Sequence, residues 1–150
     1  MPGWGADLAG GGTQRAALSA FTQAVARVQA GGGDTLVLAA DNRRTRAASA
    51  QELEYGDAAA ALLVGTQNVL AEYLGAGTVT ADFVDHFRAA GEDLDYHWEE
   101  RWVRDEGITK LVPRAVQAAL QEAGVKPADI DHFIFPTTFA RMDQQLAKAC

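Results

Sequence analysis

The feature that most constrains the fold is a helical pattern that ends at glycine and is followed by a short apolar run. Apolar residues recur near a 3.6-residue period over residues 13–30, and Gly31–Gly33 end the pattern. The apolar run 35–40 then predicts a buried strand. Residues 108–123 repeat the helical period, and residues 130–135 form a second predicted buried strand. This order of helices and strands predicts an α/β layered domain.

The segments between these elements carry weaker patterns. Residues 42–52 are polar and are predicted to form a loop. The alanine-rich run 58–64 fits a helix or a strand, and residues 69–74 fit a further strand. Pro113 lies inside the pattern of the second helix, so we expect it near the first turn of that helix.

Two helix N-termini have candidate capping residues. Thr13 precedes the first helical pattern, and Thr137 or Thr138 precedes a last helix that is expected to end at Ala149. A threonine hydroxyl can accept a hydrogen bond from a backbone N–H of the first helical turn, which no helical carbonyl satisfies. These threonines are therefore predicted N-caps.

The middle of the chain is acidic and aromatic. Over residues 80–106, carboxylates alternate with five aromatic residues, and Gly91 divides the segment. The pattern predicts a short helix, a glycine turn and a second helical stretch. We expect a solvated acidic surface with aromatic side chains packed inward, in preference to a ligand site.

The composition of the chain disfavours several classes of function. The 150 residues carry a net charge of −7, which disfavours binding to nucleic acid or docking to an anionic membrane. No apolar run approaches the roughly 20 residues of a membrane span, and the first residues do not form a secretory signal. The single cysteine, Cys150, cannot form an internal disulfide or a cysteine-based zinc site, so no metal is expected and the predicted setting is the cytoplasm.

Few residues are candidates for catalysis. The histidines are scattered, at His86, His97 and His132, and nothing in the sequence suggests a base beside Cys150. Gly10–Gly12 before the first helix could receive an anion at the helix N-terminus, but such glycines are common.

Several motifs, in order along the chain, resemble the ketoacyl-ACP synthase III and hydroxymethylglutaryl-CoA synthase branch of the thiolase superfamily. Gly56–Gly65 is similar to the Gly-Asp-Gly-Ala-Ala-Ala stretch of these enzymes. The helix and strand upstream of it resemble those that follow the nucleophilic cysteine. Residues 82–88 and 98–107 look like a signature of the bacterial and archaeal synthases, and residues 123–136 resemble the approach to the catalytic histidine.

The resemblance implies a thiolase-like layered α/β/α fold that is incomplete in this chain, which would be truncated at both ends. Residues 1–66 would form the later part of the first half. Residues 67–150 would form the early part of the second half, with an acidic aromatic helical insertion at about 80–106. The family implies acyl transfer from acyl-CoA in lipid metabolism, with no bound cofactor. Expected partners are a second copy in a homodimer, a complementing thiolase-like chain, or an OB-fold protein with a zinc ribbon.

The chain departs from the family at both catalytic positions. Matching the Ala-Ala-Leu motif places Gly11 at the cysteine, or Ala9 after a small shift. Matching the second strand places Pro136 at the histidine, or Thr137 after a shift of one residue. None of these residues transfers a proton at neutral pH as histidine does. We therefore expect no catalytic competence from this chain alone.

Three hypotheses remain open. The chain is an acyl-thioester condensing enzyme whose missing groups come from another chain, or it is a non-catalytic partner or scaffold in a thiolase-type or synthase-type complex. The third hypothesis is a small α/β binding domain whose motifs are coincidental.

Several individual residues have more than one expected role. Asp57 is expected to set a turn or to bind backbone N–H groups. Glu99, Glu100 and Arg101 form either ion pairs at a subunit interface or a solvated helix face. Trp98 and Trp102 are four residues apart and are expected to pack on one helix face. The remaining candidates are three arginines that would either meet the phosphates of CoA or lie in a solvated loop: Arg43, Arg44 and Arg46.

Overall fold

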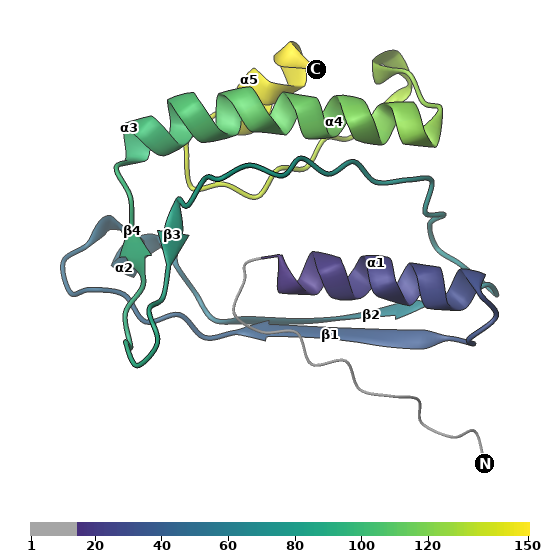
Figure 1. Cartoon of the computed structure of the whole chain (residues 1–150), viewed down its shortest axis with the longest axis horizontal. Coiled ribbons are helices and arrows are strands. Elements are labelled where there is room, and N and C mark those ends of the chain that lie inside the picture. The colour runs from purple at the N-terminus through teal and green to yellow at the C-terminus, as the bar shows by residue number, and fades with distance from the viewer. Residues whose placement is uncertain (1–14) are drawn as a thin grey trace. The chain divides into compact units, whose positions relative to one another are not determined.

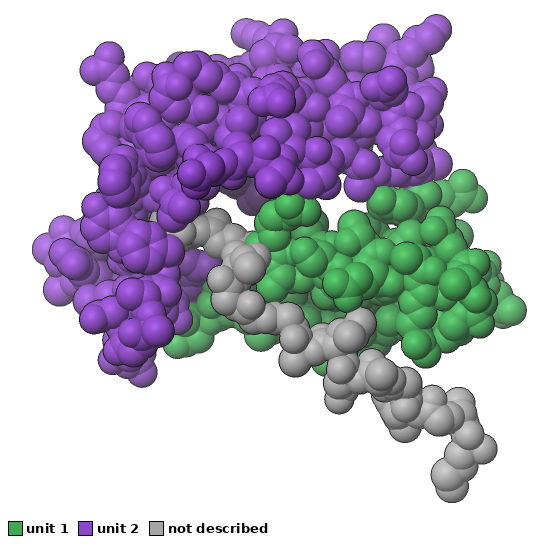
Figure 2. Space-filling model, in the orientation of Figure 1, with its two compact units in different colours: residues 1–42, 56–73 green, residues 43–55, 74–150 purple. Residues whose placement is uncertain are grey.

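The computed structural model describes residues 15–150, a mixture of helices and antiparallel strands (Figure 1). The described residues divide into two compact units, coloured separately in Figure 2. The first unit contains residues 15–42 and 56–73, and the second contains residues 43–55 and 74–150. The mixed helix and sheet content agrees with the α/β class, whereas the division into two halves at residue 66 stays a prediction. No helix between residues 15 and 150 combines the length and apolarity needed to cross a bilayer.

The first unit is a helix packed on a β-hairpin. Helix α1 (Ala16–Gln29) is followed by strands β1 (Thr35–Asp41) and β2 (Ala58–Val64), which pair antiparallel along their full lengths. Ala24 and Val25 of α1 and Val37 of β1 are the buried residues of this unit. The predicted first helix and first strand are confirmed, and the run 58–64 is a strand. The predicted cap Thr13 lies outside the described residues.

The prediction that the first strand is buried is wrong. Val37 is buried, but Leu36 and Leu38 remain 52% and 69% exposed. Leu36 lies opposite Leu63, which is 66% exposed, so these leucines share one face of the hairpin. We call Leu36, Leu38 and Leu63 the open sheet face. No described residue of the first unit covers them, and this leaves apolar area in contact with solvent.

The second unit begins with a short helix where a loop was expected. Helix α2 (Ala50–Glu54) starts at Ser49, whose Oγ accepts a hydrogen bond from the Glu52 N–H at 3.3 Å. The Glu52 carboxylate in turn accepts one from the Ala48 N–H at 2.6 Å. The Ser-x-x-Glu spacing of a capping box is visible in the sequence, and it explains why this polar segment becomes helical.

The acidic aromatic segment forms a hairpin and then a helix. Strands β3 (His86–Phe87) and β4 (Tyr96–His97) pair antiparallel. Strand β3 lies where the first short helix was predicted, so that prediction is wrong, and β4 occupies the start of the predicted second helical stretch. The predicted glycine turn is confirmed, because Gly91 adopts a φ of +83° between the strands. The second predicted helix is also present, and it begins at Glu100.

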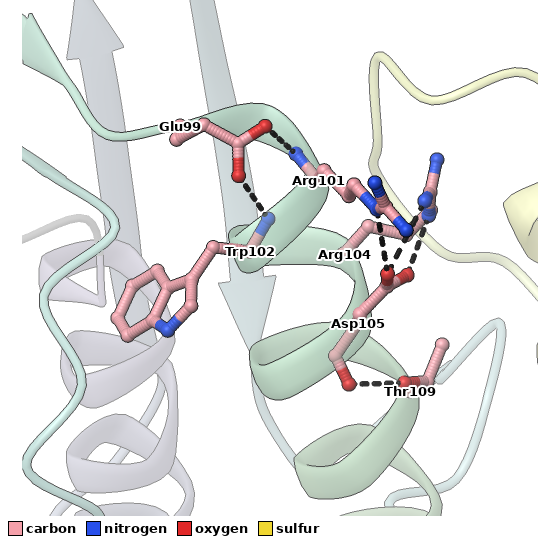
Figure 3. Close-up of polar contacts among 6 residues, drawn as sticks. All are labelled: Glu99, Arg101, Trp102, Arg104, Asp105 and Thr109. Carbon is pink, nitrogen blue, oxygen red and sulfur yellow. Dashed lines mark hydrogen bonds and ion pairs between the residues drawn. The ribbon is translucent and has the colours of Figure 1, made fainter.

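Three helical segments run without a break from Glu100 to Ala123: α3 (Glu100–Trp102), the π-helical turn η1 (Val103–Ile108) and α4 (Thr109–Ala123). In the π-helical turn the Thr109 N–H is bonded to the carbonyl of Arg104. The Thr109 hydroxyl donates to the carbonyl of Asp105 at 2.7 Å (Figure 3).

Pro113 lies in the interior of α4, so its predicted position in the first turn is wrong. The predicted end of this helix is confirmed at Gly124, which has a φ of +65°. The N–H groups of Gly124 and Val125 cap the carbonyls of Gln121 and Leu120.

The segment before the hairpin lies directly against α4. A Cβ added at Gly77 would overlap the Ala115 carbonyl oxygen and the Ala119 amide nitrogen. One added at Gly107 would lie 2.5 Å from the ring of Phe83. Glycine is therefore required at both positions by close approach, and alanines on this face of α4 leave room for the extended segment.

Two predicted strands are absent. Residues 69–74 and 130–135 pair with no other strand among the described residues, and Ile134 is 88% exposed. An extended apolar run becomes a strand only where a neighbouring strand bonds its backbone groups, and neither run has one here.

The end of the chain keeps its predicted turn and last helix. The predicted turn after α4 is the short helix η2 (Pro127–Asp129). Helix α5 (Met142–Ala149) starts later than predicted, after Arg141 rather than at a threonine. Its residues Met142 and Leu146, together with Val103, are the buried core of the second unit.

Candidate functional site

An ion-pair cluster in the second unit joins the loop before α2 to the hairpin. Arg43 Nη1 lies 2.6 Å from Asp95 Oδ2, and Arg88 Nε lies 2.7 Å from Asp95 Oδ1. The Asp95 side chain is only 9% exposed, while Arg43 and Arg88 are 23% and 39% exposed. One carboxylate thus accepts charge-assisted hydrogen bonds from two guanidinium groups, and its contact with Arg43 spans 52 positions of sequence.

The cluster changes the acidity of two groups. Burial of Asp95 raises its pKa, but hydrogen bonds from Arg88 and Arg43 outweigh this and hold the pKa below its ordinary value. Burial raises the pKa of the Tyr55 phenol, and the Arg43 charge opposes this rise. Asp95 is therefore ionised and Tyr55 neutral at pH 7.

The three arginines that could meet CoA phosphates have different surroundings. Arg43 belongs to the cluster, and Arg44 lies 3.3 Å from the carboxylate of Asp93 with both side chains well exposed. Arg46 is exposed. The expectation of a purely solvated loop is therefore wrong for Arg43. Contact with CoA phosphates stays a prediction.

Five aromatic rings form a continuous series next to the cluster, which we call the aromatic row. Phe87 lies 5.2 Å from Tyr96, Tyr96 lies 6.0 Å from Trp98, and Trp98 lies 5.8 Å from Trp102, all between ring centroids. Trp102 then stacks on Phe83 at 4.2 Å with an interplanar angle of 9°. The predicted proximity of Trp98 and Trp102 is confirmed, but Trp98 precedes the helix, so their predicted place on one helix face is wrong.

The start of α3 is fixed by Glu99. Its carboxylate accepts hydrogen bonds from the N–H groups of Arg101 at 2.9 Å and Trp102 at 2.7 Å (Figure 3). Farther along, the guanidinium groups of Arg101 and Arg104 both approach Asp105. The hydrogen bond from Arg104 lowers the pKa of Asp105. Glu99 therefore caps the helix, a role that the sequence analysis missed because aspartate, asparagine and serine are the usual capping residues.

The residues matched to the family's catalytic positions show no catalytic grouping. Gly11 and Ala9 lie outside the described residues. Pro136 is exposed, and the Thr137 hydroxyl accepts a hydrogen bond from the Phe139 N–H at 3.1 Å. The assignment of Gly11 and Pro136 to the cysteine and histidine positions stays a prediction.

The remaining candidates for catalysis or ligand binding do not lie together. Burial raises the pKa of the Cys150 thiol, which lowers its thiolate fraction at pH 7. His97 Nδ1 lies 2.9 Å from the carbonyl of Trp98, and His132 is exposed. Asp57 is an exposed residue directly before β2, and its predicted bonding to backbone N–H groups stays a prediction. Among the side chains that the structure describes, no three histidines, cysteines or acidic residues are close enough together to hold a metal ion.

Comparison with known proteins gives two informative similarities, although no model of a known protein family matches the chain. The chain is 31% identical over 102 residues to the hydroxymethylglutaryl-CoA synthase of Methanocaldococcus jannaschii, a match that covers 67% of this chain and 29% of that protein. It is 30% identical over 106 residues to the synthase of Picrophilus torridus, covering 69% of this chain and 30% of that protein. The resemblance predicted from sequence is confirmed, and the matched part takes up less than a third of each relative's length.

Proposed function

We propose, on the premise that this chain is a partial relative of hydroxymethylglutaryl-CoA synthases, that it contributes to an acyl-CoA condensing enzyme without being catalytic alone. The observation that carries the proposal is the match of about two thirds of the chain to two such synthases. The matched part is small compared with either relative, so the complete reaction requires residues from elsewhere. Acyl-CoA is the proposed substrate class.

The chemistry proposed for the complete enzyme needs a nucleophile and a proton-transfer group. A cysteine thiolate at a helix N-terminus would take the acyl group, and a histidine would assist the condensation. Gly11 and Pro136 offer neither a thiol nor an imidazole. The lone cysteine, Cys150, has a raised pKa, which disfavours it as a replacement nucleophile.

We further propose that the chain forms part of a thiolase-like layered α/β/α fold. The pairing of a helix with a two-stranded sheet in the first unit is compatible with one edge of such layers. The open sheet face supports the need for a covering surface. Burying its three leucines would contribute about 4 kcal/mol, given that roughly half to two thirds of each is exposed. The proposed source of that cover is a second copy or a complementing thiolase-like chain, and an OB-fold protein with a zinc ribbon is a further proposed partner.

A chimeric enzyme tests the proposal. This chain replaces the corresponding stretch of the Methanocaldococcus jannaschii synthase, and condensation of acetyl-CoA with acetoacetyl-CoA is measured. The unmodified chimera should fold with a cooperative thermal transition and show no activity. Adding Gly11→Cys and Pro136→His should restore measurable activity, whereas either change alone should not. A folded double variant that stays inactive would contradict the assignment of the two positions.

A non-catalytic scaffold role is the second candidate. The open sheet face supports docking to another protein, and Gly11 and Pro136 offer no thiol or imidazole, so the chain could dock without taking part in catalysis. Condensation assays separate the two candidates. An inactive double variant is expected both for a scaffold and for a wrong assignment of the two positions. Only a scaffold should raise the activity of the intact Methanocaldococcus jannaschii synthase when the chain is added to it.

A further inference from the structure

Three adjacent members of the aromatic row are nearly half exposed to solvent. Phe87 and Tyr96 are each 45% exposed, and Trp98 is 47% exposed. Neighbouring rings lie 5.2 and 6.0 Å apart, so the three form one continuous surface. Phe83 and Trp102, at the other end of the row, stack on each other and are partly buried. Exposed tryptophan and tyrosine side chains that lie together are typical of binding surfaces.

Polar contacts hold the backbone that carries the exposed rings. Arg88 follows Phe87 and Asp95 precedes Tyr96, so the Arg88–Asp95 ion pair closes the hairpin beside this ring pair. The backbone N–H of Trp98 donates to the carbonyl of Asp85 at 2.8 Å. These contacts order the backbone of the row before any partner arrives, which lowers the entropic cost of binding.

The charge of the surrounding segment selects the partner. Residues 82–106 contain nine acidic residues and three arginines, a net charge of −6 within a chain whose total is −7. Arg43 and Arg44 pair with Asp95 and Asp93 from the loop before α2, and with them the local net charge is −4. Lysine and arginine side chains bind the faces of tryptophan and tyrosine rings, and neighbouring carboxylates strengthen that attraction. A second copy would place two such segments together, and like charges repel.

We propose that the exposed rings of Phe87, Tyr96 and Trp98, with the acidic residues of the same segment, bind an arginine-rich or lysine-rich surface of a partner protein. The cationic side chains lie over the Tyr96 and Trp98 rings, and carboxylates at the rim attract them over longer distances. This site lies wholly within the second unit and does not depend on the proposed acyl-CoA chemistry.

The experiment measures binding of a fluorescein-labelled peptide of alternating arginine and serine to the whole chain, by fluorescence anisotropy at low salt. A peptide with glutamate in place of arginine is the ligand control. The arginine peptide should bind at least about tenfold more tightly, and its affinity should fall as salt rises.

Two pairs of variants separate specific from general attraction. Trp98→Leu keeps apolar bulk but removes the ring face, and it should weaken binding about fivefold to tenfold, while Leu70→Ala changes an exposed apolar side chain elsewhere and should have no effect. E92Q/E100Q and D129N/D131N change the net charge equally, and only the first pair lies in the acidic aromatic segment. Far-ultraviolet circular dichroism of each variant verifies that it is folded.

Several results would overturn the proposal. Unchanged affinity of folded Trp98→Leu would show that the rings take no part. Equal losses for E92Q/E100Q and D129N/D131N would show that net charge alone attracts the peptide. A dimer in light scattering that Trp98→Leu converts to a monomer would identify a second copy of the chain as the occupant.

Discussion

Replacing Asp95 by asparagine should destabilise the second unit by about 2 kcal/mol. Asp95 is 9% exposed and accepts two charge-assisted hydrogen bonds, at 2.6 and 2.7 Å. Each such bond contributes about 1.5–3 kcal/mol when well shielded. The contribution of Arg88 is smaller because that side chain is 39% exposed, and asparagine still offers one acceptor oxygen.

Urea unfolding at pH 7 measures the effect. Two of the three tryptophans, Trp98 and Trp102, lie in the second unit, so tryptophan fluorescence reports mainly on it. A loss of about 2 kcal/mol lowers the urea midpoint by about 1 M for a unit of this size. Asp93→Asn is the matched control, because Asp93 lies in the same hairpin but its ion pair with Arg44 is well exposed. We expect the free energy of unfolding of that control to fall by less than about 0.5 kcal/mol.

The difference between wild type and Asp95→Asn should also depend on pH. Because the arginines lower the folded-state pKa of Asp95 below its ordinary 3.8, the ion pairs stabilise the folded chain fully above the unfolded-state pKa. That stabilisation is lost as pH falls below 3.8 and through the folded-state pKa. Equal urea midpoints for Asp95→Asn and Asp93→Asn at pH 7 would show that the two ion pairs of Asp95 do not stabilise the second unit. A difference from wild type that persists at the lowest pH would show that the effect does not depend on the Asp95 charge.

The structure makes two further predictions. Gly77→Ala should lower the free energy of unfolding by about 3 kcal/mol, because the added Cβ would overlap backbone atoms of α4 that cannot rotate away. Gly56→Ala is the control: a Cβ there meets open space, so the urea midpoint should change little. Leu38→Lys should change the free energy of unfolding of a monomer by less than about 0.5 kcal/mol, but it should break any assembly that covers the open sheet face. Leu70→Lys, an exposed leucine of the same unit outside that face, should leave such an assembly intact. Light scattering distinguishes these outcomes, and an assembly that survives Leu38→Lys would place the contact elsewhere.

Local signals explain the parts of the fold that could be predicted. Gly31 and Gly124 adopt positive φ values at the ends of two helices, and glycine does so at little cost, so both ends are visible in the sequence. The apolar period of α1 and the continuous apolar run of β1 likewise depend on near neighbours. The start of α2 follows from Ser49 and Glu52, whose Ser-x-x-Glu spacing in the sequence is that of a capping box.

Long-range contacts explain most of what could not be predicted. Residues 86–97 form a hairpin held partly by Arg43, and no local pattern marks Asp95 among the neighbouring carboxylates as the partner of that arginine. The apolar run 130–135 has the composition of a strand but no strand beside it among the described residues. The predicted burial of β1 is wrong because burial depends on a second layer packed on the strand, and the sequence of the strand itself does not show whether that layer is present.

Intact-protein mass spectrometry after incubation with acetyl-CoA tests whether this chain alone can accept an acyl group, with Cys150→Ser as the matched control. We expect no stable acetyl adduct on either protein, because the position matched to the nucleophile is Gly11 and burial raises the pKa of the Cys150 thiol. A stable adduct on the wild-type chain that disappears in Cys150→Ser would show that the chain is an acyl acceptor without help from any other residues, and the proposed dependence on another chain would be wrong.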